Sequence, residues 1–403
     1  MPVELEQVPS IPHKACPTHC NGEEKMNKLC RQLSIESPSV TGRDCVFSFD
    51  VPVPDVPAQG ARIKVICAGA CYHPKRSPSL SSLTSVSSNS SLATEASLEG
   101  DYPVTAIPHH GVRDAALFPG YEVAGIIESL GPDVNEDCEF AVGNRVILYP
   151  YDGVPNGYVE FVVVHDLKYL IKVPENMLLS VAAMLPAGAL LAMNTVFKAH
   201  EHVQNLLNER DDDKKVCKVL IVGTGGLALW AMRIAAYHFS DIKDKVTITI
   251  ATLKDDGLMM AQEFKRVNVV QWSEDLYEKQ LIERTMDACQ GQVDVVIDFG
   301  TTSRSLHRSL QCLNKGGVVF VIKEVADRLL PKFSKRAEEK QQSIKSVELG
   351  SLEQLRELVQ LVSANKIEPP PHTVYPAEDA LEVVQKLCNS KIQGRAILRF
   401  MTD

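Results

Sequence analysis

The stretch Val216-Cys217-Lys218-Val219-Leu220-Ile221-Val222-Gly223-Thr224-Gly225-Gly226-Leu227-Ala228 decides the fold of this 403-residue chain. Its first half is almost wholly apolar, as a strand buried on both faces is, and it runs directly into a glycine-rich turn. A helix over Leu227–Phe239 follows, and Val246–Ala251 has the composition of a second buried strand. This order of strand, turn, helix and strand predicts a βαβ unit in a parallel sheet.

The glycine turn has the spacing of a dinucleotide fingerprint. Gly223 permits the tight turn, Gly225 lets the backbone approach a pyrophosphate, and Ala228 allows close packing of helix and strand. A pyrophosphate would bind the free N–H groups at the helix start. The cofactor-binding residues predicted here are Gly223, Thr224, Gly225, Gly226 and Leu227. The alternative is a doubly wound domain that keeps the turn for packing only.

The end of the second strand points to the kind of dinucleotide. An acidic side chain there normally binds the ribose diol, but this strand ends in Thr252-Leu253-Lys254. A hydroxyl and a lysine suit a 2′-phosphate better than a bare ribose. The sequence therefore favours NADP(H) over NAD(H), with Thr252 and Lys254 as the discriminating residues.

The rest of the chain contains two regions with different patterns of strands and helices. Val293–Phe299 and Gly317–Ile322 are further buried strands around a helix at Arg304–Leu313, which extends the parallel sheet. Upstream, strand signals such as Ala61–Ala68 and Tyr121–Ser129 are separated by turns and predict a mostly antiparallel domain. The fold class is therefore α/β, with a β-rich domain beside a doubly wound parallel-sheet domain.

Composition excludes several functions. The chain is 45% hydrophobic and 23% charged with a net charge of −9, so neither nucleic acid nor a membrane is an expected partner. No secretory signal is visible at the amino terminus, and the 11 cysteines are expected to be reduced in the cytoplasm. Residues 1–40 are predicted to be a flexible tail, and the serine-rich stretch within 76–111 a mobile insertion.

With the glycine turn, five further segments in the same order resemble the medium-chain dehydrogenase/reductase superfamily, in its zinc alcohol dehydrogenase-like and sorbitol dehydrogenase-like branch. The resemblance covers about residues 45–403. The segments are Ile66-Cys67-Ala68-Gly69-Ala70-Cys71, Pro119-Gly120-Tyr121-Glu122-Val123-Ala124-Gly125, Val142-Gly143-Asn144-Arg145-Val146, Ala182-Ala183-Met184-Leu185-Pro186-Ala187-Gly188-Ala189 and Gly394-Arg395-Ala396-Ile397-Leu398.

The resemblance implies a GroES-like catalytic domain over 41–189 and 336–403, and a Rossmann domain inserted at 190–335. It also implies a nicotinamide cofactor in the cleft between them, with Arg395 on the pyrophosphate, and a homodimer or homotetramer joined through the nucleotide domains.

The zinc site that this resemblance implies is degenerate. Cys71 matches the first ligand and Glu122 the adjacent glutamate, but Tyr121 stands in place of histidine and Ala187 in place of the third ligand. A neutral phenol is a poor zinc ligand and a methyl group is none. No metal is therefore expected, and no four-cysteine structural lobe is present either.

The neighbouring positions depart from the family as well. His73 replaces the hydroxyl residue that relays a proton, and Leu191 replaces the threonine that touches the nicotinamide. A rebuilt metal site using Cys71, His73, His109, His110 and Glu122 is a weaker alternative, because no spacing supports it.

Two functions follow. The first is an NADP(H)-dependent, metal-independent oxidoreductase acting on a carbonyl, enone or quinone-type small molecule, with Tyr121 or His73 as proton donor and Cys71 and Glu122 beside the reaction. The second is a catalytically inactive pseudoenzyme that keeps the fold for nucleotide sensing or protein interaction. A zinc alcohol or polyol dehydrogenase is a third, weaker reading.

Overall fold

The computed structural model of the protein describes the chain in segments. These are residues 29–35, 45–70, 121–151, 157–209, 216–223, 225–252, 258–259, 261–262, 264, 267–273, 276–300, 302–388 and 391–401. Cys71, His73, Thr224, Lys254, the histidine pair His109-His110 and the predicted insertion at 76–111 lie outside them.

A six-stranded parallel sheet is the centre of one lobe. Its order is β10-β9-β8-β11-β12-β13, and all of its neighbouring strands pair in parallel. In chain order the strands are β8 (Cys217–Val222), β9 (Val246–Thr252), β10 (Asn268–Gln271), β11 (Val293–Asp298), β12 (Leu313–Ile322) and β13 (Ser343–Val347). The order reverses between β8 and β11, and ligands of such sheets bind at this switch point, outside the carboxyl ends of the strands.

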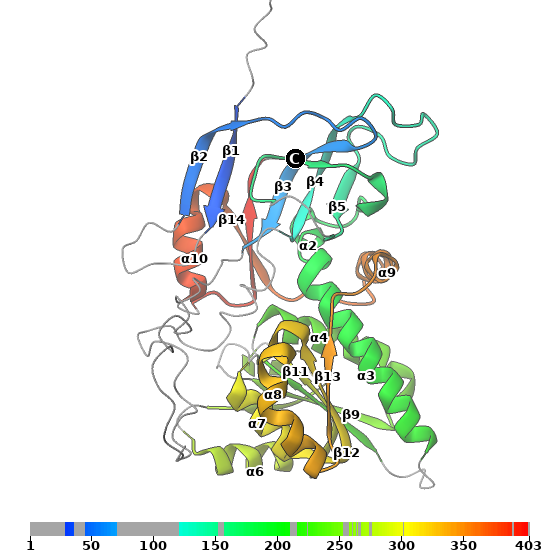
Figure 1. Ribbon diagram of the computed structural model, residues 1–403, viewed down its shortest axis with the longest axis vertical. Helices are drawn as coiled ribbons and strands as arrows, with labels where there is room; N and C mark the ends of the chain where they lie inside the picture. Colours follow the sequence, from blue (N-terminus) through cyan, green and yellow to red (C-terminus); the bar gives the residue numbers. More distant parts are fainter. Residues whose placement is uncertain are drawn as a thin grey trace, which may run out of the picture.

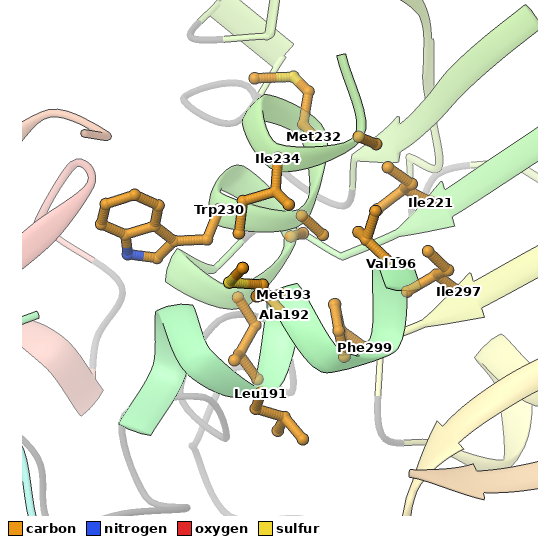
Figure 2. Close-up of a cluster of buried hydrophobic side chains, with 14 of the residues drawn as sticks. Leu191, Ala192, Met193, Val196, Ile221, Trp230, Met232, Ile234, Ile297 and Phe299 are labelled. Atoms are coloured by element: carbon orange, nitrogen blue, oxygen red, sulfur yellow. The ribbon is translucent and has the colours of Figure 1, made fainter. Parts of the chain in front are cut away.

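Helices cover this sheet in the manner of a doubly wound domain. They are α3 (Leu190–Asn208), α4 (Gly226–His238), α6 (Glu278–Ala288), α7 (Ser303–Cys312) and α8 (Lys323–Glu339). The first ten residues of α4 are all buried, because this helix packs against α3 as well as against β8 and β9. Side chains from α3, α4 and the strands meet in one apolar core (Figure 2).

A seven-stranded, mostly antiparallel sheet forms the second lobe (Figure 1). Its main path is β14-β15-β3-β4-β5-β7, with β6 paired to β3. The strands are β3 (Ala61–Gly69), β4 (Val123–Leu130), β5 (Arg145–Leu148), β6 (Phe161–Val164), β7 (Leu170–Lys172), β14 (His372–Pro376) and β15 (Arg395–Arg399). Both ends of the chain therefore contribute to this lobe.

The remaining elements connect the two lobes or pack against them. Helix α2 (Leu179–Ala182) and the π-helical turn η4 (Leu185–Ala189) lead into α3, which runs from the β-rich lobe along the parallel sheet (Figure 1). Helix α9 (Leu352–Ser363) packs against α3, and α10 (Ala380–Cys388) contacts β14. None of the helices that the structure describes combines the length and hydropathy needed to cross a membrane.

Two sequence predictions need correction. Part of the predicted tail forms β1 (Leu29–Ile35), which pairs antiparallel with β2 (Cys45–Pro52), because Cys30 and Leu33 are buried. The domain boundary predicted at residue 335 falls inside α8, and β13 beyond it belongs to the parallel sheet, so that domain extends at least to Val347.

Candidate functional site

The glycine turn has the geometry that its sequence predicts. Gly223 has φ +146, a conformation that side chains rarely adopt, and a Cβ there would lie 3.0 Å from the Ala228 Cβ. Gly225 is the N-cap of α4 and provides no side-chain cap. The first N–H groups of α4 are thus available at the positive end of a 13-residue helix, which suits an anion.

A buried ion pair lies directly beside this turn. Arg395, at the start of β15, donates from Nη2 to Glu122 Oε2, and both side chains are buried. The other carboxylate oxygen of Glu122 accepts from the Gly188 N–H at 3.1 Å. The pair therefore joins β4, the π-helical turn and β15, segments that are far apart in the sequence.

Glycines make room for this pair on both sides. A Cβ on Gly226 would lie 2.3 Å from Arg395 Cδ, and a Cβ on Gly69 would lie 2.0 Å from Glu122 Oε2. The guanidinium thus packs against the first residue of α4. Two positive features, the helix end and Arg395, therefore lie side by side next to the Glu122 carboxylate.

Burial and pairing act on Glu122 in opposite directions. Burial raises the pKa of Glu122, while Arg395 and the Gly188 N–H favour its ionised form. We infer that the Arg395 guanidinium keeps the Glu122 carboxylate ionised. Removing one partner of this buried pair would lower the free energy of unfolding by about 3–5 kcal/mol.

Thr252 ends β9, at the carboxyl edge of the sheet. Its side chain is buried, and Oγ1 has no hydrogen-bond partner among the residues that the structure describes. A buried hydroxyl without a partner is unfavourable, so this atom is open to a ligand oxygen at the place where the sequence predicts the ribose phosphate. Its predicted companion Lys254 is not among the described residues.

Of the three positions that correspond to zinc ligands in the family that the sequence resembles, Tyr121 and Ala187 are among the described residues and Cys71 is not. Tyr121 is 38% exposed, and Ala187 is fully buried within the π-helical turn. A methyl group offers no lone pair, so these two positions do not supply the ligands that zinc requires. In the described part of the chain, no group of three or more histidine, cysteine, aspartate or glutamate side chains is arranged to hold a metal.

Leu191, the residue at the expected nicotinamide contact, is part of the apolar core. Its side chain is buried together with Ala192 and Met193 at the start of α3, in the cluster that also contains Ile297 and Phe299 (Figure 2). An aliphatic core residue therefore occupies the position where the family resemblance implies a threonine.

The structure adds Asp298, which the sequence reading did not single out. This last residue of β11 accepts hydrogen bonds from the Gly300 N–H at 2.8 Å and from Ser309 Oγ at 3.0 Å. Burial raises its pKa to about 6, against these hydrogen bonds. Asp298 holds the loop at the switch point, and the signal for it was an acidic residue ending an apolar strand.

The structure therefore brings together six of the predicted residues. Glu122 and Leu227 lie next to Gly188, where a Cβ would be 3.7 Å from Leu227 Cδ2, and Arg395 contacts both Glu122 and Gly226. Gly223 and Gly225 complete the same turn. Thr252 lies at the end of the neighbouring strand, and Tyr121 is exposed beside Glu122. Cys71, His73, Thr224 and Lys254 are not described.

Comparison with known proteins agrees with this architecture. A family model described as zinc-binding dehydrogenase matches residues 275–398. A zinc-type alcohol dehydrogenase-like protein of Schizosaccharomyces pombe is 24% identical over 303 residues, covering 70% of this chain and 82% of the relative.

Solved structures show the same fold. The acetophenone reductase from Geotrichum candidum in complex with NAD superposes with a TM-score of 0.61 at 18% identity, covering 93% of this chain and 98% of that one. The quinone oxidoreductase from Coxiella burnetii gives 0.62 at 17% identity, with 93% and 100% covered.

A GroES-like β-rich domain joined to a Rossmann domain, with a glycine turn facing a buried ion pair, defines a two-domain dehydrogenase-type fold. In this fold, and in its sequence matches to a zinc-binding dehydrogenase family model and a zinc-type alcohol dehydrogenase-like protein, the chain resembles the medium-chain dehydrogenase/reductase superfamily.

Proposed function

We propose that this protein is an NADP(H)-binding oxidoreductase that works without a metal on a carbonyl, enone or quinone-type small molecule. The observation that carries the proposal is the Arg395–Glu122 pair packed against Gly226, at the uncapped start of α4. A dinucleotide pyrophosphate fits there, because the helix N-terminus and the guanidinium both attract negative charge.

The preference for the phosphorylated cofactor rests on the end of β9. Thr252 Oγ1 is buried and has no hydrogen-bond partner in the described part of the chain, and no carboxylate follows in the sequence at the position that normally binds the ribose diol. Thr252 and Lys254 would bind the 2′-phosphate. The relatives named above include proteins described as acting on a ketone or a quinone, which is consistent with the proposed substrate class.

The nicotinamide supplies hydride chemistry when it is bound. The chain's own residues would bind and orient the cofactor and the substrate and would protonate the substrate. Glu122 holds Arg395 against the helix end, the apolar start of α3 at Leu191 excludes water, and the Tyr121 hydroxyl would donate a proton to the substrate oxygen or carbon. His73 is the second candidate donor, and Cys71 lies in the same segment.

A fluorescence titration with NADPH and NADH tests the cofactor. We expect NADPH to bind at least about tenfold more tightly than NADH, because each lost phosphate contact is worth a comparable factor. Thr252→Val should reduce this preference, while Gly225→Asp should abolish binding of both. Equal affinities, or no binding, would reject the assignment.

A pseudoenzyme is the second candidate, and one observation favours it. Leu191 is buried in the core, and Ala187 leaves the turn without a reactive side chain. A panel of carbonyls, enones and quinones discriminates the two. NADPH oxidation that disappears in Gly225→Asp supports the enzyme, and tight NADPH binding without oxidation supports a nucleotide-sensing role.

We also propose a cytoplasmic homodimer or homotetramer joined through the Rossmann domains. In the described part of the chain β13 is an edge strand of the parallel sheet, which leaves a strand edge for a second copy. Light scattering on the purified protein measures the oligomeric state directly.

A further inference from the structure

A compact basic cluster lies where α7 and α8 pack together, away from the glycine turn. His307 and Gln311 are one turn apart on α7, and Arg336 and Lys340 are one turn apart at the end of α8. Arg336 Nη1 donates to His307 Nδ1 at 3.3 Å, and Lys340 Nζ donates to Gln311 Oε1 at 2.9 Å. The four side chains therefore form two adjacent cross-helix contacts.

The two cations of this cluster donate to side chains that carry no negative charge. Neither Arg336 nor Lys340 forms an ion pair with any carboxylate among the residues that the structure describes. Their partners are a neutral imidazole and a neutral amide. The chain as a whole has a net charge of −9, so this local positive charge is not a general property of its surface.

The cations act on one another. Burial, Arg336, Lys340 and Arg308 lower the pKa of His307, and only Glu278 raises it. Glu278 is already engaged, since it accepts from Arg308 Nε at 2.6 Å and from Arg308 Nη2 at 2.9 Å. Burial and Arg336 also lower the pKa of Lys340. Like charges held together in this way would be relieved by a bound anion.

We propose that the cluster of His307, Gln311, Arg336 and Lys340 is a binding site for a small dianion of the phosphate monoester class. A guanidinium, an ammonium and an imidazole that can gain a second N–H are donors suited to phosphate oxygens, and the Gln311 amide adds further donors. The site is independent of the nucleotide cleft, and it does not rest on the proposed function.

The competing explanation is structural. Arg336 and Lys340 end α8, and cations at a helix C-terminus are favourable on their own. Such cations stabilise the helix but bind no anion with defined stoichiometry. The experiment must therefore separate a local site from a helix-end effect and from a diffuse field.

Calorimetric titration at low ionic strength makes this separation. The probes are sulfate and phenyl phosphate, each added to the full chain with and without NADPH. We expect one dianion per chain in both conditions, with affinity reduced about tenfold or more in Arg336→Gln and in Lys340→Gln. The matched control is Lys335→Gln, a cation of the same helix turn outside both contacts, and it should change affinity by less than about twofold.

Proton linkage gives a second readout. Sulfate remains a dianion between about pH 5.5 and pH 8, so tighter binding at the lower pH reports proton uptake by the protein. His307→Asn should retain binding at the higher pH and lose the pH dependence. Melting curves establish that each variant is folded.

The proposal is overturned by any of four results. These are no binding of either probe, equal losses in Lys335→Gln and Arg336→Gln, binding that NADPH displaces, and a change of oligomeric state in Arg336→Gln, which would make the cluster an interface between copies.

Discussion

Glu122 is the residue on which the site geometry depends. Replacing it by glutamine keeps the shape but removes the negative charge that pairs with Arg395 in this buried position. We expect Glu122→Gln to lower the free energy of unfolding by about 3 kcal/mol. The control is Glu128→Gln, which removes a more exposed partner of Arg62 and should cost less than about 1 kcal/mol.

Cofactor binding should then partly rescue the variant. A bound pyrophosphate supplies the charge that Glu122 has lost, so NADPH should raise the melting temperature of Glu122→Gln more than that of the wild type. Urea unfolding with and without NADPH measures both quantities. A smaller shift in the variant would contradict the position we assign to Arg395.

Asp298 predicts a pH dependence with a definite sign. Its pKa is about 6 in the folded protein and near 3.8 when unfolded, so the folded state binds the extra proton between these values. This contribution to stability is present at low pH and is lost as pH rises through about 6, by about 3 kcal/mol at most. The free energy of unfolding of Asp298→Asn should therefore increase relative to that of the wild type as pH rises. A difference in free energy of unfolding between the two proteins that stays constant between pH 4 and 7 would contradict a raised pKa of Asp298.

At the scale of elements, Arg31 attaches the β1–β2 hairpin to the β-rich lobe. It donates to the carboxylates of Glu160 and Glu378 and, at 2.7 Å, to the Phe400 carbonyl. Arg31→Ala should cost about 1–3 kcal/mol and increase hydrogen exchange in β1 and β2. Protection against hydrogen exchange in the parallel sheet should stay unchanged. A uniform loss of this protection across both lobes would show that Arg31 does not act locally on β1 and β2.

The contact between α3 and α4 should weaken in acid. His238 stacks on Phe197, with ring centroids 4.5 Å apart, and also meets His200. Burial, with His200, lowers its pKa to about 4. The neutral ring therefore contributes stability at neutral pH that is lost as pH falls from about 6.5 through 4.

His238→Phe should remove this acid loss, and the exposed His165→Gln should leave it in place. Thermal melts across the pH range compare the three proteins. An unchanged acid slope in His238→Phe would show that His238 does not cause it.

At the scale of the whole molecule, local pattern predicted most elements of the fold. β8, α4 and β11 follow from apolar runs and the glycine turn, because a buried strand leaves a continuous signal. β1 was missed because its pairing shifts register between Cys30 and Gln32, which breaks the alternation of buried residues. Helix α8 was missed because Pro331 interrupts a strongly polar segment.

The candidate site was predictable only in part. The glycine turn is local, so its residues could be named from sequence. The contact between Glu122 and Arg395 joins residues 273 positions apart, and the basic cluster joins α7 to an unpredicted helix. No periodicity carries such information, since it depends on how the two lobes and their helices pack.

Oxidation of NADPH by the chelator-treated protein distinguishes a metal-independent oxidoreductase from a zinc enzyme and from a pseudoenzyme. The nicotinamide absorbance is followed with a panel of carbonyls, enones and quinones, beside Gly225→Asp as the inactive control. We expect that at least one class of compound is reduced, that chelation does not change the rate, and that Tyr121→Phe lowers the rate. Oxidation that stops on chelation and returns with zinc, or no oxidation by any member of the panel, would contradict a metal-independent oxidoreductase.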